Sequence, residues 1–128
     1  MFNNIYKNKK VIVTGNTGFK GTWLTVMLIK LGADVVGISK DLPSSPSMFE
    51  ELALKDRIKH YNQDIRDLSR MVQIISDEKP DFLFHLAAQP LVSISYADPV
   101  NTISSNVMGT TNILESLKIT NSHCTAVI

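Results

Sequence analysis

Three glycines at three-residue intervals follow a short β-branched run near the start of this 128-residue chain. Residues 14–21 read Thr-Gly-Asn-Thr-Gly-Phe-Lys-Gly, and an apolar-periodic segment comes next. The pattern predicts a strand, a tight turn and a helix start, where unpaired N–H groups carry the positive end of the helix dipole. A diphosphate satisfies such groups. We therefore expect a dinucleotide to bind at Gly15, Asn16, Thr17, Gly18, Phe19, Lys20 and Gly21.

Each glycine of this turn has an expected task. Gly15 permits the tight turn, Gly18 lets the backbone approach a diphosphate, and Gly21 lets helix and strand pack closely. The alternative is a glycine-rich turn without a ligand, in which Lys20 is only a solvated first-turn lysine. The Gly-Lys-Ser/Thr ending of a nucleoside-triphosphate loop is missing, which argues against that class.

The composition limits the class of protein and the partners that we expect. Apolar residues make up 44% and charged residues 20%, as in ordinary globular chains. The net charge is +1 without a basic block, so we expect neither nucleic acid nor an anionic membrane as a partner. Cys124 is the one cysteine, and we expect it in the core. With no signal peptide and no long apolar run, we expect a cytoplasmic protein without a metal site.

Apolar periodicity alternates between strand and helix patterns, which is typical of βαβ units. We expect strands at residues 10–13, 34–38, 58–61, 82–86 and 125–128. We expect helices after the glycine turn and at residues 47–55, 68–79 and 98–118. Right-handed crossovers then give an α/β fold, a Rossmann-type doubly wound parallel sheet of order 3-2-1-4-5. Residues 1–128 form one incomplete cofactor-binding domain in this interpretation.

The fifth strand is expected to be cut short at Ile128. Its hydrophobic edge is then open, so we expect the isolated chain to aggregate or fold only partly. The helical segments supply apolar stripes that should face the sheet. In the first helix these are Leu24, Met27, Leu28 and Leu31. In the last helix they are Ile103, Val107, Leu114 and Leu117. Asp98 and Pro99 are a typical helix start.

The glycine turn and the segment after the fourth strand both reach the switch point, where ligands of such sheets bind. Leu86, Ala87 and Ala88 leave room for a nicotinamide ribose. Gln89 is the first polar side chain beyond them and is expected to face the substrate. His85 lies within the strand, and a buried, hydrogen-bonded role is favoured over a catalytic one.

The adenosine side of the cofactor depends on the second and third strands. An acidic residue ordinarily binds the ribose at the end of the second strand, but Ser39 and Lys40 occupy that place. Asp41 lies slightly beyond the usual position of that acidic residue, so the choice between NAD and NADP stays open. The Asp64 carboxylate is expected to accept a hydrogen bond from the adenine amino group, while Ile65 packs on the base. The alternative makes Asp64 a turn residue.

Two polar residues, Asp67 and Asn106, are candidates for structural roles. Asp67 is expected to cap the helix that follows it. Asn106 either anchors the backbone of the neighbouring strand beneath the cofactor or is an ordinary exposed residue.

Taken together, these motifs resemble the extended short-chain dehydrogenase/reductase family, and more narrowly its nucleotide-sugar 4,6-dehydratases. The Thr-Gly-x-x-Gly-x-x-Gly turn, Asp64, the alanine pair and the Asn-x-x-Gly-Thr pattern at residues 106–110 carry the resemblance. Residues 17–24 and 46–50 resemble the CDP-glucose 4,6-dehydratase group in particular. Asn16 departs from the histidine usual in that group. The match covers nearly the whole chain.

The resemblance implies a redox-neutral lyase. NAD takes hydride from sugar C4, water leaves across C5 and C6, and the hydride returns to C6. A Tyr-x-x-x-Lys pair supplies the base in that family, and neither Tyr61 nor Tyr96 has a lysine at that spacing. We therefore expect the catalytic residues beyond residue 128 and no activity from these residues alone. The family also implies a homodimer formed through the helix at residues 100–118.

Other functions remain open alongside the CDP-glucose reaction. The first is another sugar-nucleotide enzyme of the family, such as a GDP-mannose dehydratase or an epimerase. The second is a non-catalytic dinucleotide-binding module. Sequence downstream of residue 128 and cofactor binding distinguish these possibilities.

Overall fold

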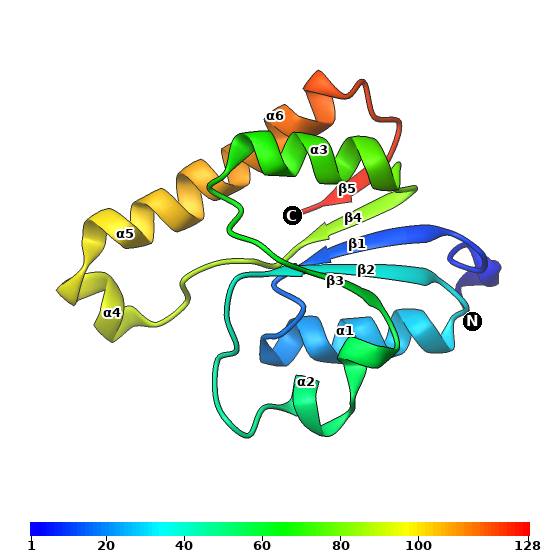
Figure 1. Cartoon of the computed structure of the whole chain (residues 1–128), viewed down its shortest axis with the longest axis horizontal. Coiled ribbons are helices and arrows are strands. Elements are labelled where there is room, and N and C mark those ends of the chain that lie inside the picture. Colours follow the sequence, from blue (N-terminus) through cyan, green and yellow to red (C-terminus); the bar gives the residue numbers. More distant parts are fainter.

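The computed structural model describes residues 1–128 and contains one parallel sheet of order β3-β2-β1-β4-β5 (Figure 1). The predicted fold class and strand order are therefore confirmed. The strands are β1 (Lys10–Thr14), β2 (Asp34–Ser39), β3 (Lys59–Asn62), β4 (Phe82–His85) and β5 (Thr125–Val127). All four neighbouring pairs are parallel, so the carboxyl ends of the strands meet at one edge.

Helices cover both faces of this sheet, with α3 and α6 on one side and α1 and α2 on the other (Figure 1). They are α1 (Phe19–Lys30), α2 (Met48–Glu51), α3 (Leu68–Glu78), α4 (Val92–Ala97), α5 (Pro99–Ile103) and α6 (Gly109–Ile119). Short 3-10 turns occupy Phe2–Asn4 and Leu54–Asp56, and a π-helical turn occupies Ser104–Met108. None of the helices has the length and apolar character needed to cross a bilayer.

Local capping explains where several helices begin. The Asp67 carboxylate accepts a hydrogen bond from the Arg70 N–H, and that of Asp98 accepts one from the Asn101 N–H, as the sequence predicts. The expected helix at residues 47–55 is interrupted. Its first turn is capped by Ser47, but Ala53 has a positive φ of 46° and separates α2 from a 3-10 turn. Helix α4 was not expected at all.

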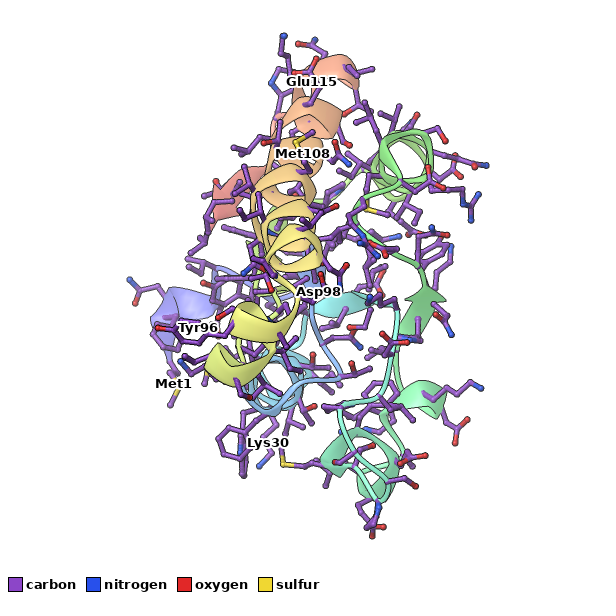
Figure 2. All side chains as sticks on the ribbon, turned by 90° about the vertical axis from the view of Figure 1, so that its left-hand side faces the viewer. Met1, Lys30, Tyr96, Asp98, Met108 and Glu115 are labelled. Carbon is purple, nitrogen blue, oxygen red and sulfur yellow. The ribbon has the colours of Figure 1, made fainter.

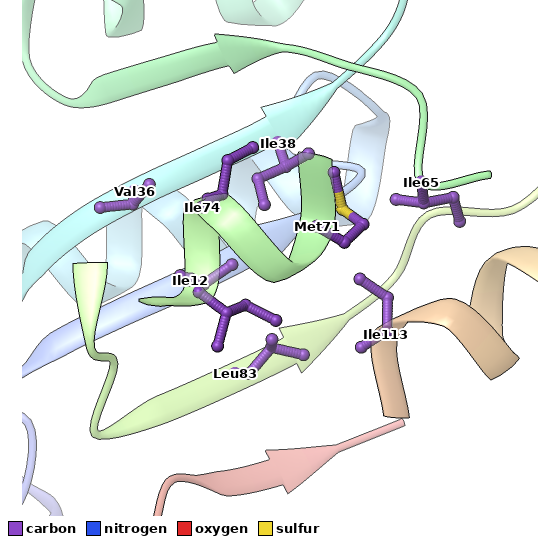
Figure 3. Close-up of a cluster of buried hydrophobic side chains, with 9 residues drawn as sticks. Ile12, Val36, Ile38, Ile65, Met71, Ile74, Leu83 and Ile113 are labelled. Carbon is purple, nitrogen blue, oxygen red and sulfur yellow. The ribbon is translucent and has the colours of Figure 1, made fainter. Parts of the chain in front are cut away.

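The larger core lies between the sheet and α3 (Figure 3). Its buried side chains are Ile12, Val36, Ile38, Ile65, Met71, Ile74, Ile75, Leu83 and Ile113. Cys124 is half-buried and packs against this cluster. On the other face, Val11, Val13 and Val35 pack against Leu28 of α1.

The expected stripe of α1 is only partly correct. Leu28 is buried and Leu24 packs against the same buried cluster, but Met27 is 45% exposed. The buried positions of α1 are Gly21, Thr22, Thr25 and Leu28. Small side chains let a helix approach its neighbours closely, so the burial of α1 follows side-chain size rather than hydrophobicity alone.

Thr25 gives a direct test of this packing. Its side chain is fully buried, and its Oγ1 has no hydrogen-bond partner. Replacing Thr25 with valine keeps the shape and removes an unpaired hydroxyl, so the free energy of unfolding should rise by about 1 kcal/mol. Urea denaturation measures the change. Thr25→Ser keeps the hydroxyl and loses a methyl group, so it should lower stability instead; a less stable valine variant would contradict the packing described.

The expected stripe of the last helix is wrong for most of its members. Ile103, Val107 and Leu114 are 60%, 55% and 49% exposed, and only Leu117 packs against the core. The buried face of α6 is Gly109, Asn112, Ile113 and Ser116. A Cβ at Gly109 would lie 2.4 Å from Cδ1 of Ile65, so glycine is what allows this contact. The apolar stripe therefore faces outward.

A buried carboxylate lies at the amino end of the sheet. The Glu78 side chain is 3% exposed and accepts hydrogen bonds from Lys10 Nζ at 3.0 Å, from Tyr61 Oη at 2.5 Å and from the Lys59 ammonium. Burial opposes ionisation, but the hydrogen bonds from Lys59, Tyr61 and Lys10 outweigh it and lower the pKa of Glu78 to about 2. The cluster ties the end of α3 to the first residues of β1 and β3.

Candidate functional site

An open cleft of about 910 Å³ lies at the carboxyl ends of the strands, within the size range of small-molecule sites. Figure 2 views the molecule from this side, with Tyr96 and Asp98 labelled on α4 and at its junction with α5. The expected site residues that line it are Gly15, Thr17, Gly18, Phe19, Lys20, Gly21, Ser39, Asp64, Ile65, Leu86, Ala87, Ala88 and Gln89. Asn16 and Asn106 do not line the cleft.

The three glycines meet different surroundings. Gly15 has a φ of +73°, and a Cβ there would lie 2.8 Å from the Ala87 nitrogen. A Cβ at Gly21 would lie 2.0 Å from the Gly15 carbonyl oxygen. At Gly18 the nearest atom is 3.4 Å away, and its φ of −72° suits any residue. Gly15 and Gly21 are thus required by the fold, whereas Gly18 lines the cleft and has room for a Cβ.

The start of α1 is built for an anion. This helix has 12 residues and begins at Phe19, and the residue before it, Gly18, has no capping side chain. The N–H groups of Phe19, Lys20 and Gly21 make no hydrogen bond within the protein. Free N–H groups and the helix dipole together favour phosphate at this position. The residues present therefore fit the diphosphate of a dinucleotide.

Asn16 differs from the expected role because its side chain is fully buried behind the turn. The amide occupies the space that a side chain at Gly37 would take, since a Cβ there would lie 2.3 Å from Nδ2 of Asn16. Its Oδ1 accepts a hydrogen bond from Ser39 Oγ at 2.8 Å. The Asn16 side chain therefore does not reach the cleft.

The end of β2 borders the cleft without an acidic side chain at its last strand position. Ser39 Oγ is already engaged, because it accepts a hydrogen bond from the Thr17 N–H at 3.3 Å and donates to Asn16. The Lys40 ammonium lies 3.7 Å from the Asp41 carboxylate and 3.9 Å from that of Asp64. Positive and negative charges are thus mixed at the end of β2.

Asp64 carries a partner that the sequence analysis missed. The Arg66 guanidinium binds its carboxylate through Nη2 at 2.6 Å and Nε at 3.0 Å, and Arg66 also donates to Asn101 Oδ1 at 2.7 Å. The hydrogen bond from Arg66 holds the pKa of Asp64 below its ordinary value, although burial opposes this. The Asp-x-Arg spacing was the available signal.

The end of β4 is fixed by a chain of hydrogen bonds. Thr14 Oγ1 accepts bonds from the N–H groups of Leu86 and Ala87, both at 3.1 Å, and lies 2.7 Å from His85 Nδ1. His85 Nε2 lies 2.9 Å from Thr110 Oγ1. His85 is thus buried and hydrogen-bonded, as predicted, and burial lowers its pKa.

Asn106 lies in the π-helical turn and holds the segment after β4. Its Oδ1 accepts the Gln89 N–H at 2.7 Å, and its Nδ2 donates to the Gln89 carbonyl at 3.1 Å. The Gln89 side chain turns back, accepting the Leu91 N–H at 2.7 Å and donating to Thr102 Oγ1 at 3.0 Å. Asn106 makes the anchoring contact considered from sequence, whereas the amide of Gln89 is occupied within its own loop.

One Tyr-x-x-x-Lys pattern is present, at Tyr6 and Lys10, and the sequence analysis overlooked it. The Tyr6 ring packs on Phe82 with centroids 5.1 Å apart, and Lys10 pairs with Glu78. Lys10 begins β1 and Thr14 ends it at the cleft, so the strand separates the two by roughly 13 Å. The pair therefore lies at the wrong end of the sheet to act in the cleft.

The chain is similar to known nucleotide-sugar enzymes. The sequence profile described as GDP-mannose 4,6 dehydratase matches residues 12–128. CDP-glucose 4,6-dehydratase of Salmonella typhimurium strain LT2 is 47% identical over 90% of the chain and 32% of the relative. A GDP-mannose 4,6-dehydratase of Vibrio cholerae is 31% identical over 87% of the chain and 32% of the relative. The chain thus spans about a third of these proteins.

Solved structures of nucleotide-sugar enzymes also resemble the chain. UDP-glucose 4-epimerase of Thermotoga maritima, solved with UDP-glucose, has a TM-score of 0.77 and 31% identity over 88% of the chain and 35% of that structure. UDP-glucose 4-epimerase of Thermus thermophilus, solved with NAD, has a TM-score of 0.76 and 26% identity over 88% of the chain and 34% of that structure. The chain belongs to the GDP-mannose 4,6 dehydratase family of nucleotide-sugar enzymes, within the extended short-chain dehydrogenase/reductases.

Proposed function

We propose that these residues are the cofactor-binding part of a nucleotide-sugar 4,6-dehydratase, a lyase that acts on CDP-glucose with NAD as cofactor. The observation that carries the cofactor assignment is the row of free N–H groups at the start of α1, next to a glycine whose missing side chain leaves the cleft open. The substrate assignment rests on the 47% identity to the Salmonella CDP-glucose 4,6-dehydratase.

Different residues of the cleft bind different parts of the cofactor. The N–H groups of Phe19, Lys20 and Gly21 hold the diphosphate, and Lys20 adds positive charge at the edge. Asp64 and Ile65 hold the adenine. For Asp64 to accept the adenine amino group, one of its bonds to Arg66 must lengthen, because both carboxylate oxygens are occupied.

The nicotinamide side lies along Leu86, Ala87 and Ala88, whose positions Thr14 and Asn106 fix. A nicotinamide supplies reversible two-electron oxidation of the sugar when it is bound there. Gln89 faces the sugar in this proposal through its backbone and loop, since its amide is occupied by Leu91 and Thr102. The base and acid of the reaction come from outside residues 1–128, because Tyr6 and Lys10 lie away from the cleft.

A homodimer is the proposed assembly of the complete protein. The outward stripe of Val100, Ile103, Val107 and Leu114 is an apolar face on α5, the π-helical turn and α6. Burying such a face against a twin removes it from water.

The function is tested on the complete protein with CDP-, GDP-, UDP- and dTDP-glucose. Mass spectrometry should show the loss of one water from CDP-glucose with no net consumption of NAD. Preference for another nucleotide would move the assignment to a different dehydratase. An epimerised sugar of unchanged mass would indicate an epimerase, and cofactor binding without turnover of any sugar would indicate a binding module. Isothermal titration with NAD and NADP decides the cofactor.

A further inference from the structure

A line of side-chain hydrogen bonds runs behind the glycine turn from β3 to the edge of the cleft. His60 Nδ1 lies 3.2 Å from Asn16 Nδ2, and Asn16 Oδ1 accepts from Ser39 Oγ at 2.8 Å. Ser39 Oγ in turn accepts the Thr17 N–H at 3.3 Å. Thr17 and Ser39 both line the cleft, whereas His60 does not. A residue outside the site is therefore connected to two residues within it.

The direction of each bond in this line is determined by its chemistry. The Thr17 N–H can only donate, so Ser39 Oγ accepts there and sends its own proton to Asn16 Oδ1. That bond orients the amide with Nδ2 toward His60, and an NH₂ group can only donate. Nδ1 of His60 must then be the acceptor, which makes His60 neutral with its proton on Nε2.

The opposite amide orientation leaves a group unsatisfied. Turning Asn16 over would place its Nδ2 next to Ser39 Oγ, and the serine proton would lose its acceptor. Such a turn would be needed if His60 carried a proton on Nδ1. Asn16 is fully buried and Ser39 is 8% exposed, so little water can replace the lost bond.

The surroundings of His60 favour its neutral form. The imidazole is half-buried, and its ring lies 5.2 Å from that of Phe49. Burial and the nearby Lys55 ammonium both lower the pKa of His60. The charge and the packing around the ring thus agree with the proton arrangement that the hydrogen bonds require.

We propose that His60 is a positioning residue for the cofactor: through Asn16 it holds Ser39 and the Thr17 N–H in place beneath the phosphate-binding turn. This inference rests on the proposed cofactor site. A turn held in one geometry before binding loses less freedom when the cofactor binds, so the hydrogen bonds behind it contribute to affinity without touching the ligand.

The test uses two variants of the same shape in the complete protein. Asparagine places Oδ1 where His60 has Nδ1 and keeps the acceptor, whereas leucine removes it. Isothermal titration with NAD at pH 7.5 should show that His60→Leu weakens binding about tenfold, the cost of one hydrogen bond, while His60→Asn stays within about threefold of the wild type. His123→Leu, at an exposed residue at the other end of the sheet, should have no effect.

Nuclear magnetic resonance tests the same inference without cofactor. The ring nitrogens of His60 should show the Nε2–H tautomer at pH 7.5, and the Thr17 amide signal should shift in His60→Leu but not in His60→Asn. A proton on Nδ1, or equal loss of affinity in both variants, would overturn the inference. If the wild type binds neither NAD nor NADP, the proposed function fails, and the tautomer and the Thr17 signal still decide whether the hydrogen-bonded line exists.

Discussion

Replacing Gly18 with valine should leave the domain folded and weaken NAD binding more than about 100-fold. The backbone of Gly18 is extended, with φ −72° and ψ 167°, and a Cβ there meets its nearest atom at 3.4 Å. The branched side chain therefore fits the protein but fills the approach to the free N–H groups of Phe19, Lys20 and Gly21. Isothermal titration gives the affinity and thermal unfolding gives the stability.

Gly21→Val is the matched comparison within the same turn. A Cβ at Gly21 would lie 2.0 Å from the Gly15 carbonyl oxygen, so this variant should lose the fold rather than the ligand alone. Replacing the N-cap glycine at position 18 with an apolar residue lowers the free energy of unfolding by less than about 1 kcal/mol. Unaltered NAD affinity in Gly18→Val would show that the diphosphate does not lie at this turn.

The second large effect is expected at Glu78, far from the cleft. Glu78→Gln removes the charge that Lys10 and Lys59 share, leaving two ammonium groups close together at the amino end of the sheet. Breaking a buried pair in this way should lower the free energy of unfolding by about 3 kcal/mol at pH 7. Glu115→Gln is the control, because Glu115 pairs only with the exposed Lys118 on α6 and should change stability by less than about 0.5 kcal/mol.

The contribution of Glu78 also has a definite pH dependence. Its pKa is about 2 in the folded chain, against an ordinary value of 4.5. The unfolded state therefore binds the proton first, so the stabilisation is complete above pH 4.5 and is lost as the pH falls from 4.5 towards 2. Urea denaturation between pH 3 and 7 should show a steeper acid loss for the wild type than for Glu78→Gln. Parallel curves would contradict the assignment.

The sequence predicts the sheet better than it predicts the helix faces. The strands and their order follow from β-branched runs, turns and right-handed crossovers, and Asp67 and Asp98 mark two helix starts correctly. The stripe of α1 is only partly correct and that of α6 is mostly wrong, because periodicity indicates an apolar face but not which face is covered. In both helices, small residues such as Gly21 and Gly109 decide the packing, since they permit contacts that larger side chains prevent.

The candidate site shows a similar division. Glycine spacing locates the turn, but the inward side chain of Asn16 depends on Gly37, which is distant in sequence. The hydrogen bonds from Arg66 to Asp64 also depend on how the loop folds. Tyr6 and Lys10 satisfy a catalytic spacing at the wrong end of the sheet, because spacing alone does not reveal which end of a strand a residue occupies.

The hydroxyl of Thr14 has consequences for which residues position 14 can accommodate. It uses two lone pairs for the N–H groups of Leu86 and Ala87 and its proton for His85, so no hydrogen-bonding capacity is left over. Valine would match its volume yet leave the Ala87 N–H and His85 Nδ1 without this partner, while the Leu86 N–H would keep only its bond to the carbonyl oxygen of residue 14 at 3.2 Å. Of the encoded amino acids, serine alone offers the same three bonds from the same atom, and variation at this position is accordingly restricted to a choice between two.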